Sequence, residues 1–306
     1  MRSRILSAAL VAVVAATGLT ACGSGGPRSL LESIRGGEVV LGTKYDQPGL
    51  GLRNPDKSMT GFDVDVLEYV VAAIADELGV EHPEISWKEA PSAQRETLIR
   101  NGEVDAIAAT YSISTSRDAS VEFGGPYLET QQALLVRRDD ESLTGLADLD
   151  AGRKLCSVAG STSAQNVEKQ LPGVQLQQFD SYSSCVEALH QRKVDALTTD
   201  ATILAGFSDQ YPGEFQIVGM EILKDTFKED GSPDKKAGDP FSTERYGIGV
   251  TDKDTEAQEA INRALDKMIA DGEWERALMD NVGQAMEEAD YPAPEPPTPG
   301  DLSFLD

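Results

Sequence analysis

A short apolar run, followed by hydroxyl side chains and one arginine, is the stretch best suited to chemistry. Asp105 begins it, and residues 106–109 read Ala-Ile-Ala-Ala, which is typical of a strand covered on both faces. Thr110 and Ser112 follow at the carboxyl end of this strand, where ligands bind in open α/β sheets. Arg117 then offers a planar guanidinium that fits a carboxylate in a bidentate manner. We therefore expect a carboxylate-binding site at this strand end.

The same pattern recurs 90 residues further along the chain with a different ending. Residues 100–106 read Arg-Asn-Gly-Glu-Val-Asp-Ala, and residues 190–196 read His-Gln-Arg-Lys-Val-Asp-Ala. In the second copy Asp200 takes the place of Thr110. One half would then offer hydroxyls and a cation, and the other a carboxylate, which together suit a zwitterion. Chance similarity between two βαβ units is the alternative explanation.

Alternating strand and helix patterns predict the elements that position these side chains. The predicted order is strand, helix, strand, helix and strand over residues 38–43, 61–78, 84–88, 91–100 and 106–110. Gly79 is a stop for the first helix, and Pro91 lies in the first turn of the second. Such an order predicts a doubly wound α/β unit.

A second unit begins near Leu149, and its first strand ends in the run Ala159–Ser163 before another helix. Small hydroxylated residues at a helix N-terminus form an anion site from free backbone N–H groups and the helix dipole. Ser161 and Thr162 are therefore candidates for binding a carboxylate. The alternative is that one of them only caps the helix. Further strand–helix pairs are expected over residues 174–175, 182–190 and 194–207.

Two extended apolar runs, residues 132–137 and 245–250, are predicted to be crossing strands. The Gly-Gly-Pro sequence within Phe123–Tyr127 is expected to break the first unit before them. Residues 227–243 are polar and rich in Gly and Pro, which indicates a surface loop. The Pro-rich residues 291–299 predict an extended tail without helix or sheet.

The composition limits the classes of partner. At 306 residues with 40% hydrophobic side chains, the chain can form one large domain or two ordinary ones with a real core. It carries 27 basic and 52 acidic residues, for a net charge of −25. This balance argues against nucleic acid or an anionic membrane surface as a partner, because both require basic patches.

Residues 1–21 are typical of an export signal. Arg2 and Arg4 precede an apolar stretch, and the sequence Leu19-Thr-Ala-Cys22 has the shape of a bacterial lipobox. We therefore expect cleavage before Cys22 and lipid on its thiol and new amino group. Two or three acyl chains give a stable anchor, which a single chain does not. A plain secretory signal with an incidental Cys22 is the alternative. Residues 22–37 are expected to be a flexible tether.

Removal of Cys22 from the count leaves Cys156 and Cys185, an even number in an exported protein. Cys156 lies in a predicted strand and Cys185 begins a helical pattern, so we expect a disulfide, with two buried thiols as the alternative. A bridge over this separation stabilises by roughly 3–4 kcal/mol in the chain-entropy model. His82 and His190 have no metal-ligand spacing, so neither a metal nor a cofactor is expected.

Five motifs in order resemble the extracellular solute-binding proteins of amino-acid ABC importers, the bacterial solute-binding protein family 3. They are Gly61-Phe-Asp-Val-Asp65, Ile113-Ser-Thr-Ser-Arg117, Phe123-Gly-Gly-Pro-Tyr127, Gly160-Ser-Thr162 and Val194-Asp-Ala…Asp200. The resemblance runs from Glu38 to about Gly283. Residues 41–53, 92–95 and 299–306 are similar in particular to the glutamate-binding lipoproteins of actinobacteria.

The resemblance implies an α/β fold: a two-lobed periplasmic-binding-protein clamp of type II, with a doubly wound sheet in each lobe and two crossing strands between them. The implied division is a lipoprotein signal peptide over 1–21, a tether over 22–37, lobe 1 over 38–129 and 248–286, lobe 2 over 130–247, and a Pro-rich tail over 287–306.

The resemblance also implies how an amino acid is held between the lobes. An arginine in the place of Arg117 binds the α-carboxylate, and Ser112, Ser161 and Thr162 share that work. An aspartate in the place of Asp200 binds the α-ammonium, with Thr110 beside it. These roles agree with the residue types, a guanidinium for a carboxylate and a carboxylate for an ammonium.

In dicarboxylate-binding relatives, basic residues at the places of Lys44 and Arg95 bind the distal carboxylate. The alternatives are an ordinary exposed lysine and a surface helix residue, while Asp46 is expected to orient Lys44 or to cap its loop. L-glutamate is the expected ligand on this basis, because buried cations act in a low dielectric and overcome the acidic surface. If Lys44 and Arg95 point elsewhere, glutamine is favoured, and aspartate and asparagine stay open.

The implied partners are the permease and ATPase subunits of an ABC transporter. The protein itself is expected to be a monomer, lipid-anchored on the extracellular face of the cell membrane. A lipoprotein that senses amino acids for a signalling partner would need the same pocket. A dehydratase-like enzyme on this fold is a further alternative, but the sequence contains no evident nucleophile–base pair.

Overall fold

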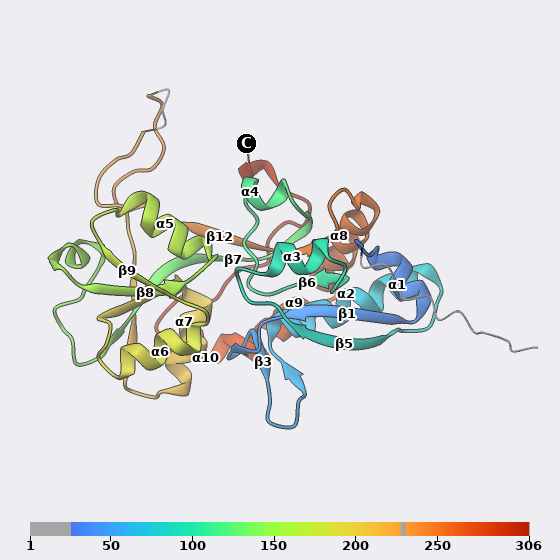
Figure 1. The fold of residues 1–306 in the computed structure, drawn as a ribbon, viewed down its shortest axis with the longest axis horizontal. Coiled ribbons are helices and arrows are strands. Elements are labelled where there is room, and N and C mark those ends of the chain that lie inside the picture. Colours follow the sequence, from blue (N-terminus) through green and yellow to red (C-terminus); the bar gives the residue numbers. More distant parts are fainter. Residues whose placement is uncertain (1–25, 228–230, 306) are drawn as a thin grey trace, which may run out of the picture.

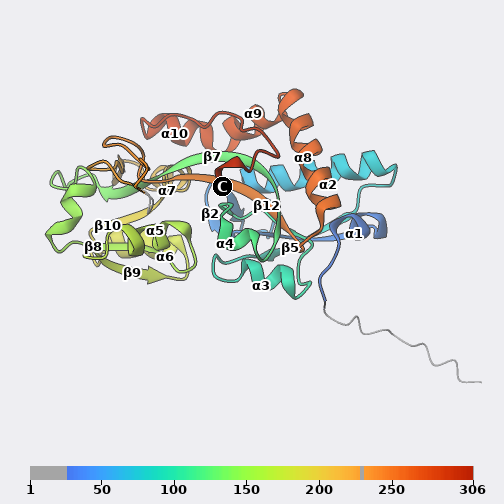
Figure 2. The ribbon, with the colours of Figure 1, turned by 90° about the horizontal axis from the view of Figure 1, so that it is seen from above.

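The computed structural model describes residues 26–227 and 231–305, which form two α/β lobes lying side by side (Figures 1 and 2). The predicted export signal over residues 1–21 and the predicted lipid-bearing Cys22 lie outside the described residues. Among the residues described, no helix is both long and apolar enough to cross a membrane.

The first lobe is built on three parallel strands in the order β5-β1-β6. Its strands are β1 (Glu38–Thr43), β2 (Asp46–Gln47), β3 (Gly51–Arg53), β4 (Met59–Thr60), β5 (Glu84–Glu89) and β6 (Ala106–Ile107). Its helices are α1 (Leu30–Gly36), α2 (Phe62–Leu78), α3 (Arg95–Arg100), α4 (Thr115–Asp118), α8 (Thr255–Ala270) and α9 (Glu273–Leu278). The predicted helix that stops at Gly79 is confirmed, since Gly79 has left-handed backbone at its C-cap.

Two first-lobe elements are shorter than predicted. The helix expected over 91–100 begins only at Arg95, because the N–H of Gln94 bonds to the carbonyl of Pro91 in a turn. The strand expected over 106–110 is reduced to Ala106–Ile107, and Thr110 has a positive φ of 45°. The backbone after this strand is therefore irregular. It places the side chain of Thr110 in the cavity between the lobes.

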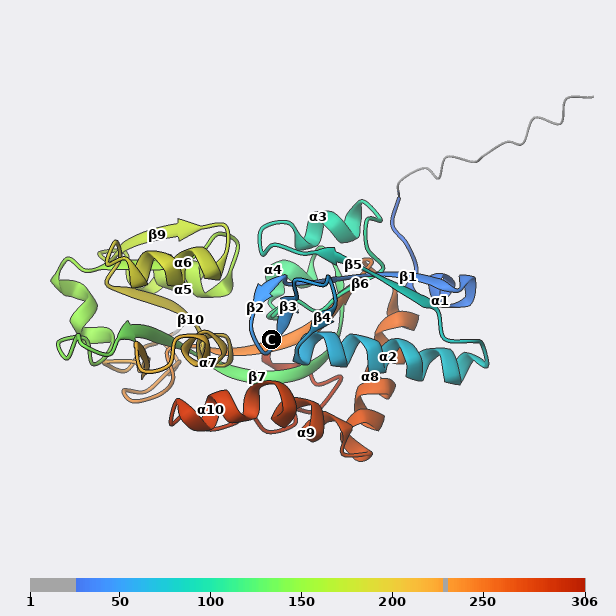
Figure 3. The same ribbon diagram turned by 90° about the horizontal axis from the view of Figure 1, so that it is seen from below.

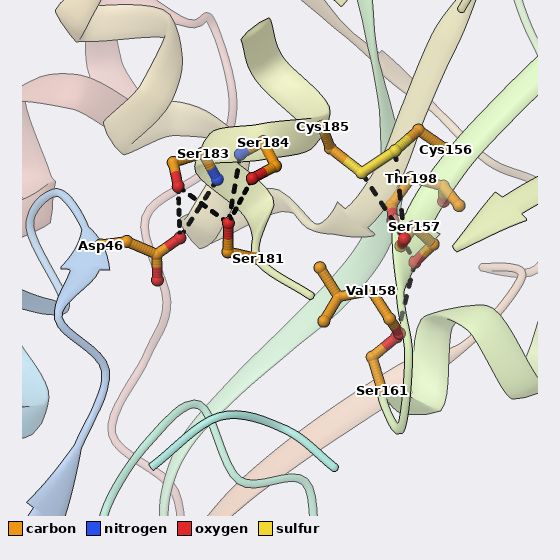
Figure 4. Close-up of a disulfide and its surroundings, with 10 residues drawn as sticks. All are labelled: Asp46, Cys156, Ser157, Val158, Ser161, Ser181, Ser183, Ser184, Cys185 and Thr198. Atoms are coloured by element: carbon orange, nitrogen blue, oxygen red, sulfur yellow. Dashed lines mark hydrogen bonds between the residues drawn. A yellow bond between two sulfur atoms is a disulfide. The ribbon is translucent and has the colours of Figure 1, made fainter. Parts of the chain in front are cut away.

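The second lobe has parallel strands in the order β10-β8-β9. Its elements are η1 (Leu146–Ala151), β8 (Lys154–Val158), α5 (Thr162–Gln170), β9 (Gln175–Phe179), α6 (Tyr182–His190), β10 (Ala196–Asp200), α7 (Ala201–Gln210) and β11 (Phe215–Gly219). The predicted disulfide is confirmed, and it joins Cys156 of β8 to Cys185 of α6 with the Cα atoms 5.9 Å apart (Figure 4).

Two long strands, β7 (Glu122–Arg137) and β12 (Thr243–Val250), run antiparallel and connect the lobes (Figure 1). The expectation that Phe123–Tyr127 separates the first unit from the crossing strand is wrong, because β7 continues through these residues. The register shifts between Tyr246 and Ile248, so residues 125–127 of β7 lie opposite Gly247. Pro126, which lacks an N–H, is tolerated at this irregularity.

The predicted tether over residues 22–37 is wrong for its second half, because Leu30–Gly36 forms helix α1. Leu30, Leu31 and Ile34 are buried against the first lobe. Apolar residues at this spacing form one face of a helix, which explains why the segment folds onto the lobe.

The C-terminal segment crosses between the lobes (Figure 3). From α9 the chain continues through η2 (Met279–Gly283) into α10 (Gln284–Glu288), whose Met286 packs with Ala205 of α7. Residues 248–286 were predicted to belong to the first lobe. The contact of Met286 shows that the end of this range packs against the second lobe instead. Residues 291–299 have no helix or sheet, as predicted, and then the N–H of Gly300 bonds to the carbonyl of Gly125 at 2.7 Å. A short helical turn, η3 (Ser303–Leu305), follows.

The repeated sequence pattern has a structural counterpart in two aspartates. The side chain of Asp105 accepts from the N–H of Val40, and its own N–H bonds to the Val40 carbonyl. Asp195 makes the same pair of bonds with Lys154. Each aspartate thus fixes the start of one strand beside its parallel neighbour, so both strand ends are delivered to the same place in their lobes.

Candidate functional site

The strand ends of the two lobes enclose a cavity of about 10 Å³. It is lined by Ser92, Arg95, Thr110, Ser161, Thr162, Ser163, Tyr182, Asp200 and Ile203. Five of these nine were predicted as site residues: Arg95, Thr110, Ser161, Thr162 and Asp200. Because a cavity of this size holds about one water molecule, an amino acid can enter only when the lobes move apart.

Arg95, which opens α3, is 1% exposed and lies in the wall of this cavity. Its Nη1 donates to the carbonyls of Ala109 and Thr110 at 3.0 and 3.1 Å. Its guanidinium lies over the Tyr111 ring, 4.3 Å from the centroid. Burial, together with the charge of Arg117, lowers the pKa of Arg95 to about 10. The alternative that Arg95 is a surface helix residue is therefore excluded.

Arg117, from α4, is also buried but does not line the cavity. Its Nη1 donates to the Ser112 carbonyl at 2.6 Å, and its Nε lies 3.4 Å from Glu96 Oε1. Its Nη2 donates to the carbonyl of Gly160 in the second lobe at 2.9 Å, and Arg95 donates to the same oxygen at 3.4 Å. One carbonyl of the second lobe thus accepts from both arginines of the first.

Lys44 lies just behind the cavity wall, where its Nζ donates to the Ser92 hydroxyl at 2.8 Å. It is 5% exposed, so it is not the ordinary surface lysine of the alternative interpretation. Burial first, and the nearby Arg95 second, hold the pKa of Lys44 well below its usual range. Asp46 neither bonds to Lys44 nor caps its own loop. Its carboxylate accepts from Ser183 of the second lobe.

Asp200 ends β10 on the opposite wall of the cavity. It accepts from the hydroxyls of Tyr246 and Ser163 at 2.5 and 3.3 Å. In the part of the chain that the structure describes, Asp200 forms no ion pair. Burial, reinforced by the charge of Glu244, raises the pKa of Asp200 to about 7.

Thr110 is held by a residue whose role the sequence did not reveal. The N–H of Thr110 donates to Asp63 Oδ2 at 2.8 Å, and the Tyr127 hydroxyl donates to Asp63 Oδ1 at 2.7 Å. Burial raises the pKa of Asp63 to about 6 despite these donors. Asp63 lies in the motif Gly61–Asp65, so the pattern marked it, but nothing local indicated that it positions the backbone of Thr110.

The loop before α5 combines capping with contact between the lobes. Ser161 is the N-cap of α5 and accepts from the N–H of Ala164 at 3.0 Å, which confirms the capping interpretation for this residue. The hydroxyls of Thr162 and Ser112 lie 3.2 Å apart across the two lobes. A Cβ on Gly160 would lie 2.7 Å from the Cα of Ala93, so glycine permits this close approach of the lobes.

Four residues that line the cavity were not predicted as site residues: Ser92, Ser163, Tyr182 and Ile203. Ser92 and Ser163 lie in the runs 92–95 and 159–163, which were singled out in the sequence. Neither serine was itself predicted to be a site residue. Tyr182 and Ile203 occupy helices at positions where aromatic and apolar side chains usually belong to the core, so the sequence carried no signal for them.

The fold and the cavity define a two-lobed binding protein, and the comparisons identify its family. Residues 39–283 match the model for bacterial extracellular solute-binding proteins, family 3, so the chain belongs to this family. Membership places it outside the cytoplasm, in an extracellular or periplasmic location. The fold agrees with that of an ancestral arginine-binding protein bound to glutamine, with a TM-score of 0.65 and 29% identity over 81% of this chain and 98% of that one.

More particular similarity is found among curated relatives. The chain is 57% identical over 307 residues to the glutamate-binding protein GluB of Corynebacterium efficiens, covering 100% of this chain and 98% of the relative. It is 60% identical over 289 residues to GluB of Corynebacterium glutamicum, covering 94% and 92%. A glutamine-binding protein of an ABC transporter, GlnH of Bacillus subtilis, is 32% identical and covers 89% and 94%. The chain is thus an amino-acid solute-binding protein rather than an enzyme.

Proposed function

We propose that this protein captures an acidic amino acid, L-glutamate in the first place, between its two lobes and delivers it to an ABC importer. The observation that carries this proposal is the opposition of charges across the cavity. Arg95 lines the first-lobe wall, with Lys44 and Arg117 buried beside it, and the buried carboxylate of Asp200 lines the opposite wall. A zwitterion with an additional carboxylate complements this arrangement.

The neighbours of the three cations support the proposal. Arg95 donates to backbone carbonyls and Lys44 to a hydroxyl, and neither group neutralises a positive charge. Of these three cations, Arg117 alone forms an ion pair among the described residues, with Glu96, while Asp46 and Asp63 act on Lys44 only through their charges. A buried cation without a counter-ion is costly, and a ligand carboxylate removes that cost. The names of the two corynebacterial relatives favour glutamate among the candidate ligands.

We assign the ligand's backbone groups to Arg117, Ser112, Ser161 and Thr162 at the α-carboxylate, and to Asp200 and Thr110 at the α-ammonium. Lys44 and Arg95 bind the distal carboxylate. The Gly160 carbonyl, which accepts from both arginines, is displaced from them when the lobes separate, and ligand carboxylates then take its place.

Calorimetric titration of the mature protein with glutamate, aspartate, glutamine and asparagine tests the ligand. Glutamate is expected to bind tightest. The variant Arg95→Met separates the roles of the two arginines, because it should weaken glutamate strongly and glutamine much less. Equal loss for both ligands would refute the assignment of Arg95 to the side chain. A melting curve of the variant controls for the loss of its backbone hydrogen bonds.

We further propose that Cys22 anchors the protein to the outer face of the cell membrane through lipid. Cys22→Ala should release it from the membrane fraction, while the glutamate affinity of the soluble form stays unchanged. A variant that remains in the membrane fraction would point to a different anchor.

A further inference from the structure

The two lobes also meet outside the cavity, at residues 46–51, which comprise β2, the turn after it and the first residue of β3 and are called the turn below. Asp46 Oδ2 accepts from the backbone N–H of Ser183 at 3.1 Å and from its hydroxyl at 2.9 Å. Figure 4 shows this carboxylate reaching from the first lobe to the end of α6 in the second. Neither Asp46 nor Ser183 lines the ligand cavity.

The carboxylate docks at a favourable place on α6. Ser183 lies in the first turn of this nine-residue helix, where N–H groups have no partner within the helix. The N-cap Ser181 accepts from the N–H of Ser184, which leaves the N–H of Ser183 for Asp46. The positive end of the helix dipole favours a negative charge here. Asp46 thus completes, from the first lobe, the capping of a helix in the second.

A second contact of the same turn depends on a missing side chain. Gly206 lies within α7, and a Cβ built on it would be 2.2 Å from the carbonyl oxygen of Pro48. Backbone this close cannot accommodate even a methyl group, so the first lobe reaches this position only because residue 206 is glycine. Alanine would otherwise be favoured within a helix.

The turn is rigidly attached to the wall of the ligand cavity. The N–H groups of Phe62 and Asp63 donate to the carbonyls of Gly49 and Leu50 at 2.9 and 3.0 Å, at the start of α2. Asp63 in turn holds the N–H of Thr110 in the cavity wall. The position of the turn relative to α6 and α7 therefore follows the separation of the two walls.

We propose that the turn of residues 46–51 is a latch that stabilises lobe closure without touching the ligand. Asp46 accepts hydrogen bonds at the N-terminus of α6, and the Pro48 carbonyl packs against α7 where Gly206 has no side chain. The latch rests on the proposed function, because it acts on the clamp that encloses the amino acid. It makes glutamate affinity depend on residues that no ligand contacts.

Single-molecule energy transfer between dyes on Glu81→Cys and Lys193→Cys, one in each lobe, measures closure in the full mature chain, with Cys22→Ser preventing stray labelling. Gly206→Ala should widen the closed form and weaken glutamate binding about tenfold, the equivalent of about 1.4 kcal/mol. Its melting temperature should not fall, because alanine favours the helix. Asp46→Asn should weaken binding about threefold, and salt should reduce that difference by screening the charge.

Two matched controls come from the same chain. Asp56 accepts from the N–H and hydroxyl of Ser58 within the first lobe, so Asp56→Asn removes the charge from the same kind of contact without affecting closure. Gly36 is a helical glycine with open space around its Cβ position, so Gly36→Ala tests the substitution itself. Both controls should bind and close like the unmodified protein.

The latch is refuted if Gly206→Ala and Asp46→Asn close and bind like the unmodified protein, or if the controls lose as much. Closure is also measured without any amino acid, where both variants should lower the closed fraction. If the unmodified protein does not bind glutamate, the proposal of glutamate as the ligand is refuted. The closed fractions measured without amino acid still decide whether the latch exists.

Discussion

The two walls of the cavity hold opposite charges by different means. On the first-lobe side, Arg95 in the wall and Arg117 beside it donate mainly to backbone carbonyls, those of Ala109, Thr110 and Ser112 in their own lobe and that of Gly160 in the second. In the second lobe Asp200 rests on two hydroxyls, those of Tyr246 and Ser163. Carbonyls and hydroxyls orient a charge without cancelling it. Under the proposed function, a zwitterionic ligand neutralises these charges from between the lobes, and binding is thereby coupled to closure.

Asp200 carries the one carboxylate among the described residues that line the cavity, and its removal should have the largest effect. Asp200→Ala leaves the ligand ammonium without its partner, and losing one member of a buried charge pair costs roughly 2–5 kcal/mol. All amino-acid ligands should weaken alike, as they should with Arg117→Met. Small-angle scattering with excess glutamate should show that Asp200→Ala holds ligand on the first lobe without closing. A variant that still closes would contradict the division of labour between the walls.

The two lobes also differ in covalent stabilisation. Among the described residues, the disulfide between Cys156 and Cys185 lies in the second lobe. Cys156→Ala with Cys185→Ala should lower the free energy of unfolding by roughly 3–4 kcal/mol in the chain-entropy model. Hydrogen exchange should rise in β8, β9 and α6, while β1, β5 and α2 stay protected. Thiol labelling of the denatured, unreduced protein should find neither cysteine free. Labelling of both would show that the bridge is not formed.

The pH dependence of binding should distinguish the carboxylate wall from the arginine wall. The pKa of Asp200 is raised to about 7, and a bound ammonium favours its ionised form, so binding below this pH releases a proton. Glutamate affinity should fall about tenfold for each pH unit below about 7. Titrations in buffers of different ionisation enthalpy report the proton release. Asp200→Asn should remove this component of the dependence and serves as the control.

The same shift has the opposite consequence for the stability of the ligand-free protein. Asp200 has its ordinary pKa of 3.8 in the unfolded chain, and burial raises this pKa to about 7 in the folded one. Between these values the folded state binds more protons, so this residue's contribution to stability is present at low pH and is lost as pH rises toward 7. Thermal melts of the protein and of Asp200→Asn between pH 4 and about 7.5 would test this sign.

The smallest effects are expected from removing the two hydroxyls that donate to Asp200, one at a time. Ser163→Ala removes the longer bond, of 3.3 Å, and should weaken glutamate by roughly 0.5–1.5 kcal/mol. Tyr246→Phe removes the 2.5 Å bond to a charged group and should cost roughly 1.5–3 kcal/mol. If both variants lose equally, Asp200 is oriented by its place at the end of β10 rather than by these donors.

Much of the fold could be predicted from the sequence because its signals are local. The apolar face that ends at Gly79 specified α2, and the strand of residues 38–43 formed as its pattern indicated. The repeat around Asp105 and Asp195 correctly pointed to two strand ends, since each aspartate acts on a neighbouring strand in the same way. Where a local signal misled, as at Pro126 in β7, the partner strand provided an irregularity that tolerates proline.

The residue types around the cavity were likewise readable from the sequence, because a buried arginine or aspartate at a strand end has few other uses. What surrounds each of them was decided by tertiary structure. Asp63 holds Thr110 from 47 residues away, and Gly160 reaches both arginines from the other lobe. Asp46 contacts Ser183 rather than Lys44, its near neighbour in sequence. The Asp63 contact depends on packing within the first lobe, and the Gly160 and Asp46 contacts depend on where the two lobes meet. No spacing along the chain encodes either arrangement.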